Sequence, residues 1–85
     1  MKEIKHVLTD PLGLHARPAG QMVKAVGKYK SDIQLGTAVK MVNAKRIIAV
    51  MALSMKQGQE LVMTFSGEDE EEAASFCKSF LEENL

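Results

Sequence analysis

Apolar residues recur at every second position in four short stretches of the chain. Such alternation is typical of strands that bury one face. It predicts strands at residues 4–8, 33–35, 39–41 and 61–65, the middle two joined near Gly36 and Thr37. His6 falls on the same side of the first strand as Ile4 and Leu8, so we expect a partly buried histidine whose ring is hydrogen bonded.

Three other stretches follow the spacing of a helix. From Ala16 onward the apolar residues form one stripe, Pro18 suits a first helical turn, and Gly27 suits the end of the helix. The run Ile47 to Leu53 suits a short helix, although a buried strand would show the same pattern. The last helix opens just after Ser66, with its acidic run at the end where the helix dipole favours negative charge.

The elements therefore follow one another in the order βαββαβα. The economical packing for this order is an α+β fold, an open-faced β-sandwich in which a four-stranded antiparallel sheet carries three helices on one face. Eighty-five residues can bury one such core but not two, so we expect residues 1–85 to form a single domain.

Charge and composition exclude several classes of function. Eleven Lys and Arg balance eleven Asp and Glu, whereas a nucleic-acid binder needs a basic face, so no nucleic-acid partner is expected. The longest apolar run has seven residues and no basic-then-apolar leader opens the chain, so we expect no membrane insertion. The one cysteine, Cys77, cannot form an internal disulfide, and with the two histidines it shares no metal-ligand spacing. We therefore expect a cytoplasmic protein without a metal, with Cys77 as a small buried apolar residue.

The residue before the first predicted helix is unusual. His15 stands where Ser, Thr, Asp or Asn usually accepts the unpaired N–H groups of a helix start. An imidazole there lies beside an anion-binding helix end, and Arg17 adds a guanidinium suited to phosphate oxygens. Most single loop histidines are only solvated side chains, so on physical grounds alone both interpretations stay open.

The stretch Gly13-Leu14-His15-Ala16-Arg17-Pro18-Ala19 resembles the active-site motif of the histidine-containing phosphocarrier protein (HPr) family of the bacterial phosphoenolpyruvate:sugar phosphotransferase system. The similarity extends over the whole chain. It includes the length, the element order, the segment Val42 to Lys45, the helix Ile47 to Leu53 and the segment Gly67 to Ala73.

The resemblance implies that His15 accepts a phosphoryl group from enzyme I, which phosphoenolpyruvate has charged, and passes it to a histidine on the A component of a sugar permease. The family uses Nδ1, and the sequence leaves open which nitrogen acts here. Arg17 and the backbone of Ala16 would support the phosphate. The resemblance also implies a monomeric, stoichiometric carrier that is not an enzyme and needs no cofactor.

Partners of this family dock on an apolar patch built from the first helix and the short second helix. The matching positions are Gly20, Lys24, Arg46, Ile47, Ile48 and Met51, with Lys45 as a further flanking charge. Ile47, Ile48 and Met51 are apolar. For each of them, an exposed side chain and one buried in the core are equally expected.

Two positions depart from the family pattern. Arg46 stands where many members carry a serine that a kinase phosphorylates, so that regulatory serine is absent, and Gly20 replaces the usual alanine. These departures leave an alternative open, an HPr-like regulatory binding module that acts through protein–protein contacts. A ferredoxin-like ligand-binding or RNA-binding domain has a similar element order, but the four aromatic residues leave no stacking platform for bases.

Overall fold

The computed structural model describes residues 1–85. Its strands are β1 (Lys2–Val7), β2 (Asp32–Gly36), β3 (Met41–Asn43) and β4 (Glu60–Ser66), and its helices are α1 (Ala16–Val26), α2 (Ile47–Ala52) and α3 (Glu70–Asn84). The order βαββαβα is confirmed. The apolar run that begins at Ile47 forms a helix and not a strand.

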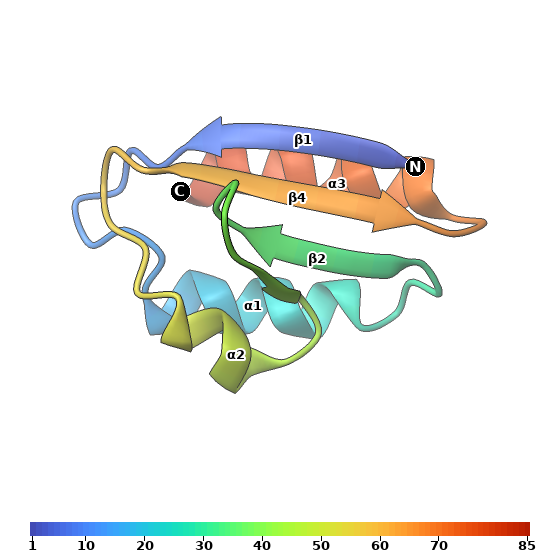
Figure 1. The fold of residues 1–85 in the computed structure, drawn as a ribbon, viewed down its shortest axis with the longest axis horizontal. Coiled ribbons are helices and arrows are strands. Elements are labelled where there is room, and N and C mark those ends of the chain that lie inside the picture. The colour runs from blue at the N-terminus through green and yellow to red at the C-terminus, as the bar shows by residue number, and fades with distance from the viewer.

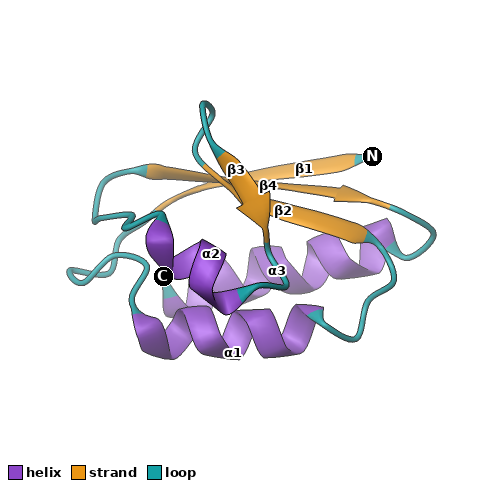
Figure 2. Ribbon diagram, turned by 60° about the horizontal axis from the view of Figure 1, so that its bottom comes forward, coloured by secondary structure: helices purple, strands orange, loops and turns teal.

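The four strands form one sheet in the order β1-β4-β2-β3, and every pair of neighbours is antiparallel. All three helices lie on one side of this sheet, as Figures 1 and 2 show, and the other side is open. The predicted open-faced β-sandwich is therefore confirmed. Helix α2 lies beside α1, close to the end of α1 that follows the first loop.

The core lies between the sheet and the helices. The alternation of β4 turns Leu61, Met63 and Phe65 to the helices, and all three are fully buried. Helix α3 packs against β1 and β4, and α1 adds to the same core an apolar stripe that includes Met22 and Val26, as its spacing predicts. Burying apolar surface on this one face of the sheet fixes which side of α1 points outward.

The third strand begins later in the chain than predicted. Val39 lies in the turn between β2 and β3 and is 95% exposed. The chain reverses there because Thr37 and Lys40 exchange backbone hydrogen bonds of 2.9 and 3.2 Å, which brings Met41 opposite Gly36. The alternation of apolar residues continues through this turn, so it could not reveal where the strand starts.

Helix α1 ends at Val26, directly before Gly27, as predicted, although Gly27 has a right-handed helical backbone and not a left-handed one. Helix α3 begins at Glu70, with three glutamates in its first turn. None of the three helices combines the length and the apolar character needed to cross a bilayer.

Candidate functional site

The loop between β1 and α1 is held against a later turn of the chain. Gly13 has a φ of +66°, and a Cβ there would clash with the Met55 carbonyl oxygen. Only glycine therefore fits this close approach. Next to it, the Leu14 N–H donates to the same Met55 oxygen at 3.0 Å. These contacts fix the backbone directly ahead of His15.

His15 is the N-cap residue of α1 and has an extended backbone. Its carbonyl oxygen accepts the first helical hydrogen bond, from Ala19 N–H at 3.1 Å, but its side chain makes no capping bond. The imidazole is 31% exposed. A typical N-cap side chain would be turned back onto the helix, whereas this ring is free to meet a ligand.

The first turn of α1 has unused hydrogen-bond donors. The backbone N–H groups of Ala16 and Arg17 make no hydrogen bond within the chain, and Pro18 has no N–H. The Arg17 side chain is exposed and takes part in no ion pair or hydrogen bond within the chain. These donors lie at the positive end of the helix dipole, an environment that favours an anion.

His15 and Arg17 line one shallow hollow, so the structure brings together the two side chains that the sequence predicts as functional. The hollow is also lined by Asp10 from the loop, Gln21 from α1 and Asn84 from the last turn of α3. The sequence analysis missed these three. Gln21 is one helical turn beyond Arg17 and could have been found by spacing, but nothing in the pattern brings Asn84 to the first helix.

The Asp10 carboxylate lies close to the His15 ring. Its Oδ2 lies 3.5 Å from His15 Nε2. Its other carboxylate oxygen, Oδ1, accepts the Leu12 N–H at 2.8 Å. The aspartate therefore closes the turn of the loop and faces the imidazole at the same time.

The apolar patch around α2 is only partly exposed. Ile48 is 83% exposed and Ile47 is 40% exposed, whereas Met51 is half-buried and packs against the core. Gly20 of α1 is half-buried, and a Cβ at this position would meet no heavy atom within 4 Å. The two isoleucines thus face outward and Met51 does not fully do so. Leu12, which the sequence analysis missed, is a further exposed apolar side chain, at 71%.

The two lysines predicted to flank the patch differ in their exposure and contacts. Lys24 is exposed in the last turn of α1, nine residues beyond His15, which corresponds to roughly 13 Å along a helix. Lys45 is half-buried, and its Nζ donates to the Tyr29 carbonyl oxygen at 2.6 Å. Lys45 therefore supports the loop after α1 and is not a free charge beside the patch.

Arg46 is the N-cap residue of α2, and its side chain makes no capping bond. Asn43 stabilises the preceding turn, because its Oδ1 accepts the Lys45 N–H at 2.9 Å and its carbonyl oxygen accepts the Arg46 N–H at 3.1 Å. The helix start thus depends on a turn built by asparagine, and the exposed Arg46 side chain is left free for other contacts.

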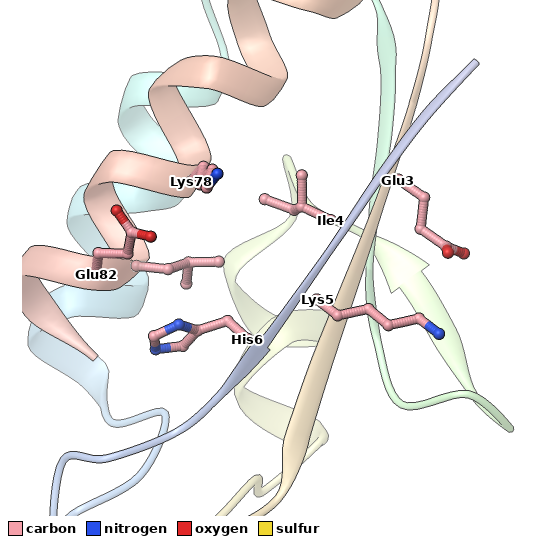
Figure 3. A pocket seen from close by; sticks show the side chains of 7 residues that line it. Glu3, Ile4, Lys5, His6, Lys78 and Glu82 are labelled. Carbon is pink, nitrogen blue, oxygen red and sulfur yellow. The ribbon is translucent and has the colours of Figure 1, made fainter.

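A second hollow lies between β1 and α3, apart from His15, and holds the other histidine. Figure 3 shows the His6 ring extending from β1 towards α3, from which Lys78 and Glu82 project. The His6 Nε2 atom is buried without a hydrogen-bond partner, so the prediction of a hydrogen-bonded ring is wrong for this atom. The apolar Leu81 lines the same hollow and offers no acceptor, and Glu82 lines it without bonding to the ring.

Cys77 is fully buried on the apolar side of α3, as predicted. Burial raises the pKa of its thiol to about 12, so the thiolate does not form near neutral pH. No three His, Cys, Asp or Glu side chains are grouped so as to hold a metal ion.

Known proteins resemble this chain over nearly its full length. The family model described as "PTS HPr component phosphorylation site" matches residues 2–83. The Phosphocarrier protein HPr of Lysinibacillus sphaericus is 40% identical over 83 residues, which cover 98% of this chain and 94% of the relative.

Two solved structures show the same fold. HPr-C-His from Thermoanaerobacter tengcongensis has a TM-score of 0.90 at 38% identity, covering 96% of this chain and 92% of that one. Crh, the Bacillus subtilis catabolite repression containing protein, has a TM-score of 0.77 at 34% identity, covering 100% of this chain and 98% of that one. The Crh structure is described as a dimer with a swapped domain.

The fold and the hollow together define a small α+β domain that presents one partly exposed histidine at the start of a helix, beside donors suited to an anion. The similarity in sequence and fold identifies the class of this domain. The chain belongs to the HPr family of the phosphotransferase system, and its general role is that of a phosphocarrier.

Proposed function

We propose that His15 is the residue that carries the phosphoryl group. It would accept this group from enzyme I, charged by phosphoenolpyruvate, and pass it to the A component of a sugar permease. The observation that carries the proposal is a partly exposed imidazole that makes no capping bond and lies beside two unused backbone N–H groups and the unpaired Arg17 guanidinium. A neutral imidazole is nucleophilic near neutral pH, and a phosphoryl group on it would meet these donors.

The donors around His15 suit a transient bond. The N–H groups of Ala16 and Arg17 would bind phosphoryl oxygens, and the Arg17 guanidinium would add a charged donor pair. Stabilisation of an anion by a helix end is roughly 0.3–2 kcal/mol. That is enough to orient the group and too little to trap it, so the protein would act as a stoichiometric carrier and not as an enzyme with turnover of its own.

The partners would dock on the exposed part of the α1–α2 surface. Ile47 and Ile48 would provide its apolar centre, and the half-buried Met51 would add an adaptable side chain. Gly20 leaves open space on the α1 side. The exposed Lys24 and Arg46 flank this surface with positive charge, which suits acidic partner proteins.

We propose further that the chain acts as a monomer in the cytoplasm. In support, β1 pairs with β4 of its own chain along its whole length, and the free Cys77 thiol suits a reducing compartment. The swapped dimer described for Crh is the specific alternative. Sedimentation at micromolar and millimolar concentrations separates the two states, and a stable dimer at micromolar concentration would contradict the monomer.

A regulatory binding module is the second candidate. Arg46 in place of the regulatory serine and the likeness to Crh, whose name refers to catabolite repression, favour it. Such a module would bind its partner through the α2 surface without carrying a phosphoryl group.

Mass spectrometry of the intact protein separates the two functions. The chain is incubated with enzyme I and phosphoenolpyruvate, then with a permease A component. A carrier gains one acid-labile phosphoryl group and loses it to the A component. The gain should disappear in His15→Ala and persist in His6→Gln, a control that changes the other histidine. No gain in the unmodified protein, or an unchanged gain in His15→Ala, would exclude the proposed role of His15.

A further inference from the structure

Asp10 and His15 form a carboxylate–imidazole pair in the hollow that they both line. The Asp10 Oδ2 atom lies 3.5 Å from His15 Nε2, and the two side chains are 27% and 31% exposed. We propose that Asp10 is a positioning residue that keeps the neutral His15 ring protonated on Nε2 and so leaves Nδ1 as the nucleophile. This inference rests on the proposed phosphoryl transfer through His15.

The preference for one ring nitrogen follows from electrostatics. A neutral imidazole has one N–H donor and one bare nitrogen. A carboxylate oxygen 3.5 Å from Nε2 attracts an N–H dipole at that atom and repels a lone pair there. The separation is longer than an ordinary hydrogen bond, and such contacts at catalytic groups often tighten only when the reaction partner binds.

Three hydrogen bonds fix Asp10, so its free oxygen is aimed at the ring by the loop itself. Oδ1 accepts the Leu12 N–H at 2.8 Å, and the Asp10 carbonyl oxygen accepts the Gly13 N–H at 2.8 Å. Its own N–H donates to the backbone oxygen of Leu85 at 3.1 Å. With both the backbone and Oδ1 held in this way, Oδ2 is the only oxygen left for His15.

The pair also suits the charge change during transfer. The Nδ1 lone pair forms the new bond to phosphorus, while the bond that joins phosphorus to the donor protein breaks and leaves its electron pair on the donor atom. The Nε2 proton stays in place, so the phosphorylated His15 ring carries a positive charge. The carboxylate of Asp10 stabilises this charge, as an aspartate stabilises an imidazolium in acyl-transfer sites. No proton has to move in either direction of transfer.

The other charged side chain in the hollow, that of Arg17, completes the arrangement. A carboxylate near a phosphoryl group repels it, and a guanidinium in the same hollow offsets this repulsion. The two side chains would therefore have opposite tasks, Arg17 towards the phosphoryl oxygens and Asp10 towards the ring.

Asp10→Asn is the sharpest test, because an asparagine preserves the turn. If its amide oxygen keeps the bond to Leu12 N–H, its NH₂ group faces Nε2 and favours the ring with the proton on Nδ1. The nitrogen chemical shifts of the His15 ring, measured where the ring is neutral, report this tautomer directly. We expect mainly Nε2–H in the unmodified protein and a clear shift towards Nδ1–H in Asp10→Asn.

The rate of phosphorylation by enzyme I provides the second measurement. We expect a decrease of about threefold to tenfold in Asp10→Ala, which loses the charge, and a larger one, about tenfold to a hundredfold, in Asp10→Asn, which also favours the wrong tautomer. Asp32→Asn removes an exposed carboxylate at the start of β2 and should change neither measurement.

Nitrogen shifts and rates that stay unchanged in Asp10→Asn, in a variant with a native amide spectrum, would overturn the proposal. If the unmodified protein accepts no phosphoryl group, the proposed function fails. The tautomer measurement still decides separately whether Asp10 controls the ring.

Discussion

The Asp69 carboxylate binds Ser31 twice: it accepts the Ser31 backbone N–H at 2.9 Å, and it also accepts the Ser31 hydroxyl. Its second oxygen accepts the Lys30 N–H at 2.8 Å. Asp69 directly precedes α3 and Ser31 directly precedes β2, so these bonds join two turns at the end of the molecule away from the first turn of α1 (Figure 1). The N-cap aspartate of α3 therefore caps a neighbouring loop and not its own helix.

This arrangement predicts a dependence of stability on pH. The hydrogen bond from the Ser31 hydroxyl, followed by that from the Lys30 N–H, holds the pKa of Asp69 below its ordinary value of 3.8. A lowered pKa in the folded state means that the stabilisation is complete above the unfolded value and is lost as pH falls through the folded one. The gap in melting temperature between the unmodified protein and Asp69→Asn should be constant above about pH 5 and shrink below about pH 4.

Asp32→Asn is the matched control for this experiment, because it removes a nearby exposed carboxylate. It should leave the melting temperature almost unchanged at every pH. A gap for Asp69→Asn that stays constant down to about pH 2 would show that the charge of Asp69 does not carry the stabilisation.

Gly20→Ala should stabilise the fold. Gly20 lies inside α1, and a Cβ there meets no heavy atom within 4 Å, so alanine gains helix propensity without a clash. We expect an increase of about 0.5–1 kcal/mol in the free energy of unfolding, measured by urea denaturation. Gly13→Ala provides the contrast, because its φ of +66° and the clash with the Met55 oxygen should make it destabilising. A loss of stability in Gly20→Ala would contradict this interpretation of α1.

Arg17→Ala should slow phosphoryl transfer without unfolding the protein. The Arg17 side chain is exposed and contacts no charged partner in the chain, so its loss removes little stability. Losing a charge-assisted donor pair to the phosphoryl group should decrease the transfer rate by about tenfold. Lys40→Ala, which removes an exposed cation from the β2–β3 turn, should leave the rate unchanged. A large loss of stability with normal transfer would make Arg17 a structural residue.

Ile48→Ala should weaken partner binding. Ile48 is 83% exposed on α2, so truncation costs little folding energy but removes apolar surface from the proposed docking face. We expect the KM of enzyme I for this protein to rise by about tenfold, with an unchanged melting temperature. Val39→Ala is the matched control, since Val39 is 95% exposed in a turn outside that face. Equal effects of the two substitutions would argue against a specific surface on α2.

Cys77 should be inert in the folded protein. Burial raises the pKa of its thiol to about 12, and its side chain is inaccessible from solvent. A thiol reagent at about pH 8 should therefore react with Cys77 only at the rate at which the protein unfolds, and at once in denaturant. A fast reaction in native buffer would mean that α3 opens locally.

Much of this fold could be predicted from the sequence, because one-sided burial leaves a periodic signal. The stripes of α1 and the alternation of β4 each reflect a single buried face. Val39 shows the limit of this signal, since an apolar residue in a turn continues an alternation that the strand does not share. Where β3 begins depends on its pairing with β2, which is a relation between two segments and not a property of either.

The candidate site also contains residues that the sequence could indicate and residues that it could not. His15 drew notice because it replaces the usual capping residue at a helix start, and Arg17 lies close to it in the sequence, but only the resemblance to a family motif favoured a functional role over a solvated side chain. Asp10 and Asn84 could not be found in this way, because a folded loop and the last turn of a distant helix bring them to the same hollow. The missing bond of His6 Nε2 also depends on what α3 places opposite β1. Periodicity records burial, but it carries no information about which side chains meet across elements.

The backbone oxygen of Leu85 accepts three hydrogen bonds from the loop ahead of His15: from the Thr9 N–H at 2.6 Å, the Asp10 N–H at 3.1 Å and the Thr9 hydroxyl at 3.0 Å. Thr9 and Leu85 are 76 positions apart in the chain. Fraying of the last turn of α3 would thus release the segment that aims Asp10 at the imidazole. Hydrogen exchange at Thr9 and Asp10 should therefore follow exchange in that turn. The stability of the loop ahead of His15 then depends on a helix at the opposite end of the sequence.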